Sequence, residues 1–161
     1  MEQNEVTQYR VYGVRWIQLL IYFLGTFANA LPSATFVPIE SETATFFSIS
    51  TTQVNALAVV FFFLYVVGTI LATWVYRLLS VRMGLIIGSI LNLGTVIRLF
   101  ALISPSSGYA ALMIGQLFPA VATPFFMNIT ALFAARWFAP KQRDLATAIG
   151  SMANPLGTNL K

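Results

Sequence analysis

The sequence has 161 residues, of which 58% are hydrophobic and only 9% are charged, with a net charge of +4 and a mean hydropathy of +0.78. Soluble domains carry about a quarter charged residues, so this composition excludes an ordinary soluble protein and places the chain in the membrane class. Cysteine and histidine do not occur and only five residues are acidic, none of them in an apolar run, so we expect neither an enzyme nor a bound metal or other cofactor.

Four apolar runs are long enough to cross a bilayer as helices. A helix rises 1.5 Å per residue, so about 20 apolar residues cross a hydrocarbon core of roughly 30 Å. Residues 1–15 are polar and are expected to form a cytoplasmic N-terminal segment, and residues 16–161 a partial transmembrane half-bundle. The predicted complete spans are residues 16–39, 54–76, 83–103 and 109–135.

The last segment, residues 145–161, has two interpretations. From Leu145 to Leu156 only about a dozen residues are mostly apolar, and roughly 18 Å of helix cannot cross a membrane. Pro155 also removes a backbone donor and clashes with the preceding turn. The segment is therefore either an incomplete fifth span, expected if the chain is a fragment, or an amphipathic cytoplasmic helix that follows a four-helix bundle.

Charges in the connecting segments are sorted by side. Cytoplasmic loops of membrane proteins carry an excess of Lys and Arg, so this sorting predicts a cytoplasmic N-terminus and indicates membrane orientation rather than nucleic-acid binding. It does not choose between the plasma membrane and an endolysosomal membrane. One side carries Arg10, Arg15, Arg77, Arg82, Arg136, Lys141 and Arg143, and the other carries Glu40 and Glu42.

A polar stripe runs along the first span. Tyr22, Thr26, Asn29 and Ser33 are spaced by four, three and four, which places them on one helical face. Lipid offers such a face no hydrogen-bond partner, so it must contact protein or water. It either lines a cavity that contacts a solute or joins helices through side-chain hydrogen bonds.

The fourth span carries a similar pair, Gln116 and Thr123, seven residues apart on one face. Pro119 and Pro124 would loosen the backbone around them, which membrane helices tolerate. This face is either a second wall of the same cavity or the packing face of a bent helix.

The third span has one charge and a pair of small residues. Arg98 is the only charged residue in a predicted span, and a mid-membrane charge is a functional candidate by default. It stands close to the outer end, however, where it could extend to the interface or form a structural ion pair. Gly84 and Gly88 form a G-x-x-x-G pair, which predicts close helix packing.

Several stretches together resemble the feline leukaemia virus subgroup C receptor-related transporters of the major facilitator superfamily. They are "YRVYGVRW" before the first span, "NA" within it, Arg82 with the glycine pair entering the third, and "ARWFAPKQRDLATAIGSMANPLG" at 135–157, the most specific of them. The resemblance implies an all-α bundle of two six-helix halves that carries haem, choline, ethanolamine or pyridoxine. It identifies this chain with spans one to four and the start of the fifth, without the C-terminal half.

The loop between spans two and three departs from the superfamily pattern. Arg77 and Ser80 stand where that pattern usually has an Asp and a Gly, whereas Arg82 and Gly88 fit it. In the superfamily this Asp braces the outward-open state. The resemblance therefore makes Arg77 and Arg82 a candidate conformational loop in which the usual brace is altered.

Two further departures concern the solute. Ser33 and Thr123 stand where choline-carrying relatives have a Trp and a Gln. An aromatic face is the usual means of holding a quaternary ammonium group, so its loss argues against choline at this position.

Two functions are compatible with this sequence. One is transport of a small organic solute by alternating access, with the chain as the N-terminal fragment of a major-facilitator carrier that is inactive alone. The alternative is a complete four-span membrane scaffold or regulatory subunit without transport activity. In either case the lipid bilayer surrounds the chain and nucleic acid is not a partner.

Overall fold

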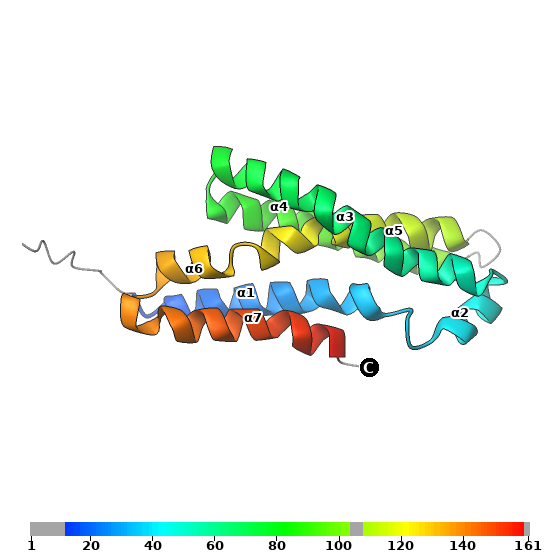
Figure 1. Cartoon of the computed structure of the whole chain (residues 1–161), viewed down its shortest axis with the longest axis horizontal. Coiled ribbons are helices and arrows are strands. Elements are labelled where there is room, and N and C mark those ends of the chain that lie inside the picture. Colours follow the sequence, from blue (N-terminus) through cyan, green and yellow to red (C-terminus); the bar gives the residue numbers. More distant parts are fainter. Residues whose placement is uncertain (1–11, 104–107, 160–161) are drawn as a thin grey trace, which may run out of the picture.

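The computed structural model describes residues 12–103 and 108–159, and over these residues the chain is built of helices without a β-strand. Most of the helical residues lie in five long segments, and shorter helices connect or extend them (Figure 1). In chain order the elements are α1 (Arg15–Ala30), η1 (Leu31–Ala34), α2 (Glu40–Phe47), α3 (Thr51–Leu78), α4 (Val81–Leu93), η2 (Gly94–Leu102), α5 (Gly108–Met127), α6 (Thr130–Trp137), η4 (Pro140–Gln142) and α7 (Arg143–Asn159), the η elements being 3₁₀ helices.

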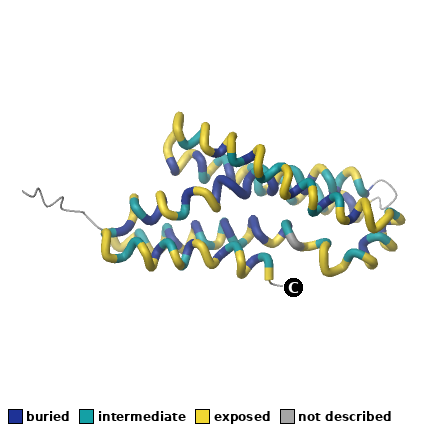
Figure 2. The backbone as a smooth tube through the Cα atoms, viewed as in Figure 1, coloured by how far each residue is buried: buried dark blue, intermediate teal, exposed yellow. Residues whose placement is uncertain are grey.

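The helices form two groups that meet at α5. Helices α1 and α7 lie side by side, and α3 and α4 pack on α5 (Figure 1). Within its most apolar stretch α5 has 56% of its residues buried, against 22% for α3 and 11% for the α4–η2 segment. Buried residues accordingly follow α5 and the facing sides of α1 and α7, and exposed residues lie on the outer faces (Figure 2). Helix α5 is therefore the centre of the bundle.

Among the residues that the structure describes, three segments are long and apolar enough to cross a membrane. They are Thr51–Leu78, Val81–Leu102 and Gly108–Met127. The first helix, α1, has 16 residues and continues only as the 3₁₀ turn of η1. The chain is thus an all-α membrane protein, and four complete spans stay a prediction.

The predicted first span is shorter as a helix than the apolar run that contains it. Residues 35–39 follow η1 without helical structure, and Pro38 disfavours helical geometry in Val37 before it. The acidic connection then forms α2, which ends at Ser48 in a left-handed conformation. Ser50 and Gln53 form a reciprocal capping box that starts α3.

The predicted fourth span is interrupted. Helix α5 ends at Met127 and α6 begins at Thr130, so Asn128 and Ile129 form a turn inside the run predicted as one helix. Asn favours turns because its side chain competes for backbone hydrogen bonds. The carbonyls freed at this break are bound by side chains of other helices, as described below.

Helix α7 continues through Pro155 and packs along α1. Its buried residues recur as Ala146, Gly150, Ala153 and Gly157, a face of small side chains. A Cβ atom placed on Gly157 would lie 2.7 Å from the Cβ atom of Ala30, so the two backbones approach closely. Small residues permit such approaches between membrane helices.

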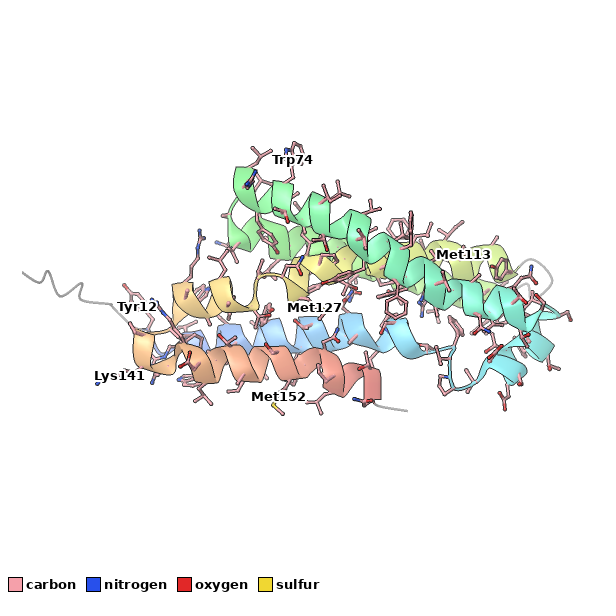
Figure 3. All side chains as sticks on the ribbon, viewed as in Figure 1. Tyr12, Trp74, Met113, Met127, Lys141 and Met152 are labelled. Carbon is pink, nitrogen blue, oxygen red and sulfur yellow. The ribbon has the colours of Figure 1, made fainter. Side chains whose placement is uncertain are left out.

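Charged residues separate along the long axis. The start of α1, the α3–α4 turn and the α6–α7 connection lie toward one end, and α2 lies at the other (Figure 1). Tyr12 and Lys141 mark the first of these ends in Figure 3. The described basic residues of the loops therefore share one end of the bundle, opposite the acidic α2.

Candidate functional site

The polar stripe of α1 turns inward. Tyr22, Thr26 and Asn29 are 3%, 2% and 1% exposed, and Ser33, in η1, is half-buried. The Thr26 hydroxyl donates to the Tyr22 carbonyl 2.9 Å away, and Ser33 donates to the carbonyl of Ala30 at 2.7 Å. These two hydroxyls are thus satisfied within their own segment, whereas Tyr22 and Asn29 bond to other helices.

Asn29 joins three helices. Its Nδ2 donates to the Asn92 Oδ1 of α4 and to the Pro119 carbonyl of α5, each 3.0 Å away. Its Oδ1 is buried and has no hydrogen-bond partner among the described residues. An amide carbonyl accepts up to two hydrogen bonds, so Asn29 retains acceptor capacity inside the bundle.

Gln116 and Thr123 of α5 are also buried, at 1% and 4% exposed. The Gln116 Nε2 donates to the Leu57 carbonyl of α3 at 3.3 Å, and its Oε1, like the Oδ1 of Asn29, is buried without a partner in the described part of the chain. Thr123 donates to the Pro119 carbonyl at 2.8 Å. Asn29 and Thr123 therefore converge on one carbonyl, whereas Gln116 points toward α3.

Two tyrosine hydroxyls bind the broken end of α5. Tyr22 of α1 donates to the Phe126 carbonyl at 2.5 Å and lies 2.6 Å from the Thr130 hydroxyl. Tyr76 of α3 donates to the Phe125 carbonyl at 2.6 Å. The last carbonyls of a helix lack intrahelical donors, and here two neighbouring helices supply them. We call this arrangement the tyrosine clasp.

The glycine pair of α4 lies where two of these aromatic residues approach. A Cβ atom on Gly84 would overlap the Tyr76 ring, and one on Gly88 would lie 2.7 Å from the Phe125 Cβ. No Cβ atom fits at such distances without displacement of its neighbour. Gly84 thereby leaves room for the Tyr76 ring of the clasp.

Arg98, in η2, reaches the end of the first helical segment. Its guanidinium donates to the Pro32 carbonyl at 3.3 Å and lies 5.2 Å from the centre of the Phe36 ring. Both contacts are typical ways to accommodate a cation, through a backbone acceptor and an aromatic face. In this structure Arg98 therefore joins the third and first segments.

Arg77 and Arg82 lie exposed on either side of the α3–α4 turn. Arg77 is in the last turn of α3, where a positive charge interacts favourably with the helix dipole. Ser80 caps α4 by accepting a hydrogen bond from the Met83 backbone at 3.3 Å. Ser80 thus has a structural role in this loop as the N-cap of α4.

Sequence reasoning did not identify Asn92 and Thr130 as partners of the α1 stripe, or Tyr76 as a partner of α5. Tyr76 stands next to Arg77 at the end of a span, where an aromatic residue is expected at the membrane interface. Asn92 is one of several polar residues in the third apolar run, with Ser89 and Thr95 on either side of it. No spacing rule links either residue to α1 or α5, because their partners are distant in the chain.

A family model described as Major Facilitator Superfamily matches residues 22–160. The chain is 34% identical over 160 residues to Solute carrier family 49 member A3 of Xenopus tropicalis, covering 95% of this chain and 33% of that protein. The protein of the same name from Danio rerio is 34% identical over 154 residues, covering 93% and 32%.

A third similar protein is named for its activity. It is the Choline/ethanolamine transporter FLVCR1 of Mus musculus, 29% identical over 145 residues, covering 89% of this chain and 26% of that protein. The chain therefore spans about a third or less of the length of these relatives.

Proposed function

The chain belongs to the major facilitator superfamily, and from this premise we propose that it forms the N-terminal part of a carrier for a small organic solute. The matched relatives are transporters and not enzymes. In such carriers two halves rock around a site near the membrane midplane and expose it alternately to each side. A single partial half cannot enclose such a site, so we propose that residues 1–161 do not transport alone.

The observation that carries this proposal is the pair of buried acceptors on α1 and α5. Asn29 Oδ1 and Gln116 Oε1 have no donor among the described residues, although both side chains are almost fully buried. Leaving a buried acceptor unpaired costs about 1–3 kcal/mol. A solute that donates hydrogen bonds would remove that cost. We therefore keep Tyr22, Thr26, Asn29, Ser33, Gln116 and Thr123 as the proposed solute pathway.

The acceptors favour a solute with hydroxyl or amino donors. Ethanolamine and pyridoxine meet this condition with several donors, whereas choline has a single hydroxyl. The relative FLVCR1 is named for both choline and ethanolamine. Haem is included among the proposed solutes only because the family resemblance implies it. Ser33 contributes a hydroxyl in η1, where an aromatic face would suit a quaternary ammonium group.

The proposed orientation and partners follow from the charges and the α7 contact. The basic end of the bundle, with Arg77 and Arg82 exposed at the α3–α4 turn, would face the cytoplasm. We propose that this turn is a conformational loop. Packing of α7 along α1 supports a place for it in the bundle as a fifth helix. The proposed C-terminal half is the remaining partner, together with the lipid bilayer.

Uptake into proteoliposomes tests this function. We expect the complete open reading frame that contains residues 1–161 to catalyse saturable uptake of radiolabelled ethanolamine, choline or pyridoxine. Residues 1–161 alone are expected to give no saturable uptake, because they lack the proposed C-terminal half of the carrier. Saturable uptake by residues 1–161 alone would contradict the proposal. A complete open reading frame that transports none of these solutes would also contradict it.

The scaffold alternative makes a different prediction for α7. A helix on the membrane surface would lie at one depth along its whole length, so single cysteines at Leu145, Met152 and Leu156, which share one side of α7, would react at similar rates from the cytoplasmic side. A fifth helix entering the bilayer would instead show reactivity that declines from Leu145 to Leu156, because the thiolate forms poorly in hydrocarbon. We expect the declining pattern.

A further inference from the structure

A polar patch lies on α3 beside the α5–α6 turn, with Tyr65 and Thr69 half-buried and Asn128 exposed. The Tyr65 hydroxyl donates to Asn128 Oδ1 at 3.2 Å, and Asn128 Nδ2 lies 3.5 Å from the Thr69 hydroxyl. Thr73 continues the row one turn further and is exposed. Tyr65, Thr69 and Thr73 are spaced by four, so they share one side of α3. We call these four residues the Tyr65–Asn128 patch.

The patch stands at mid-membrane depth. Helix α3 has 28 residues, Thr51–Leu78, and Tyr65 and Thr69 occupy its middle turns. At 1.5 Å per residue this helix is about 42 Å long, longer than a hydrocarbon core of roughly 30 Å. The middle of α3 therefore cannot reach either interface, and a tyrosine there is not an interfacial anchor.

Asn128 needs partners that lipid cannot supply. Its amide has two donors and two acceptor sites, of which the contacts to Tyr65 and Thr69 use one each. The residue is exposed and also lies in the non-helical turn between α5 and α6. Irregular backbone at membrane depth is tolerated only where it is buried in protein or lines a water-filled cavity. Protein or water, and not lipid, must therefore complete the hydrogen bonds of Asn128.

The lipid-facing side of α3 is elsewhere. Phe63 and Ile70 are each 69% exposed, and at 100° per residue they lie roughly 160° and 140° around the helix from Tyr65. Both are apolar, as a lipid-facing surface requires. Helix α3 thus has an exposed apolar side and a partly exposed polar side. Phe62, 75% exposed, lies about 60° from Tyr65 and adds an aromatic surface beside the patch.

We propose that the Tyr65–Asn128 patch is a second, water-facing wall of the solute pathway. This inference rests on the proposed transport function and extends it to α3, which contributed no residue to the predicted pathway. The patch offers hydroxyl and amide groups without charge. It would hydrogen-bond the hydroxyl or amino groups of a small organic solute, with the Phe62 ring against its apolar part, and would not recognise the solute by ion pairing.

Thiol labelling tests the water-facing wall directly. Residues 1–161 contain no cysteine, so a variant of this region adds a single reporter thiol. Thr69→Cys is compared with Ile70→Cys, because the two positions differ in membrane depth by only about 1.5 Å. Both are made in the complete open reading frame, with cysteines outside these residues replaced by serine, and treated in permeabilised membranes with a charged maleimide.

Thr69→Cys is expected to react at least about tenfold faster than Ile70→Cys, because the reactive thiolate forms in water and not in hydrocarbon. Thr73→Cys is expected to react as Thr69→Cys does, and it keeps the test decisive if Thr69→Cys does not accumulate. Equal slow rates at positions 69, 70 and 73 would overturn the proposal, since lipid or the other half would then cover the patch. The labelling result does not depend on uptake, so its failure leaves the transport proposal standing.

Discussion

Replacing Gly88 with leucine is expected to lower the free energy of unfolding by about 3 kcal/mol, the upper end of the usual cost of overpacking a core. A Cβ atom at this position would lie 2.7 Å from the Phe125 Cβ and 3.5 Å from the Phe126 Cε2. Phe125 is 2% exposed, and its Cβ is fixed to the backbone of α5. It cannot swing aside, so the helices themselves must separate.

Thermal unfolding in detergent measures this effect. For a chain of this size 1 kcal/mol corresponds to a change in Tm of about 2–4 °C, so Gly88→Leu should lower Tm by about 6–12 °C. Ser89→Leu is the matched control, because Ser89 is exposed on the same helix and a leucine there meets lipid. Its Tm should change little. A Gly88→Leu variant as stable as Ser89→Leu would show that α4 and α5 are not in close contact.

Removing the tyrosine clasp should produce the second large effect. Tyr22→Phe and Tyr76→Phe keep both rings, including the stack of Tyr22 on Phe133 at 4.7 Å between ring centroids, and remove only the hydroxyls. The Phe126 and Phe125 carbonyls then lose the donors that the structure provides. Leaving a buried acceptor unpaired costs about 1–3 kcal/mol, whereas interhelical hydrogen bonds in membranes average about 0.6 kcal/mol.

We expect about 1 kcal/mol for each single variant and roughly 2–3 kcal/mol for the double variant, because a broken helix end has no intrahelical donor to substitute. The double variant should lower Tm by about 4–12 °C. Tyr12→Phe is the control, since Tyr12 is 63% exposed and lies outside the helices. A double variant with the Tm of this control would mean that the hydroxyls do not stabilise the break.

The clasp also bears on transport. It joins α1 and α3 to the end of α5. We therefore expect a change in the position of α1 to move the α5–α6 turn. If α1 and α5 line the proposed pathway, the double variant should also reduce uptake by the complete open reading frame at equal protein abundance.

Local sequence patterns were sufficient to predict the membrane class, the approximate positions of the helices and the separation of charge. Hydropathy is summed over neighbouring residues, and loop charge is counted next to the helices, so neither depends on distant contacts. The spacing of Tyr22, Thr26 and Asn29 likewise placed them on one face of α1, and the structure buries all three. A helical period contains that information because residues three and four apart are always neighbours.

Only the tertiary structure decided which groups meet. Tyr76 and the Phe125 carbonyl are 49 positions apart, and Asn29 and Asn92 are 63 apart, distances over which no periodicity applies. The interruption at Asn128 was unpredictable for the same reason: its cost depends on hydroxyls that α1 and α3 bring to the freed carbonyls. Hydropathy marks where a chain enters the bilayer, but hydrogen bonds between distant segments determine where a helix inside it can break.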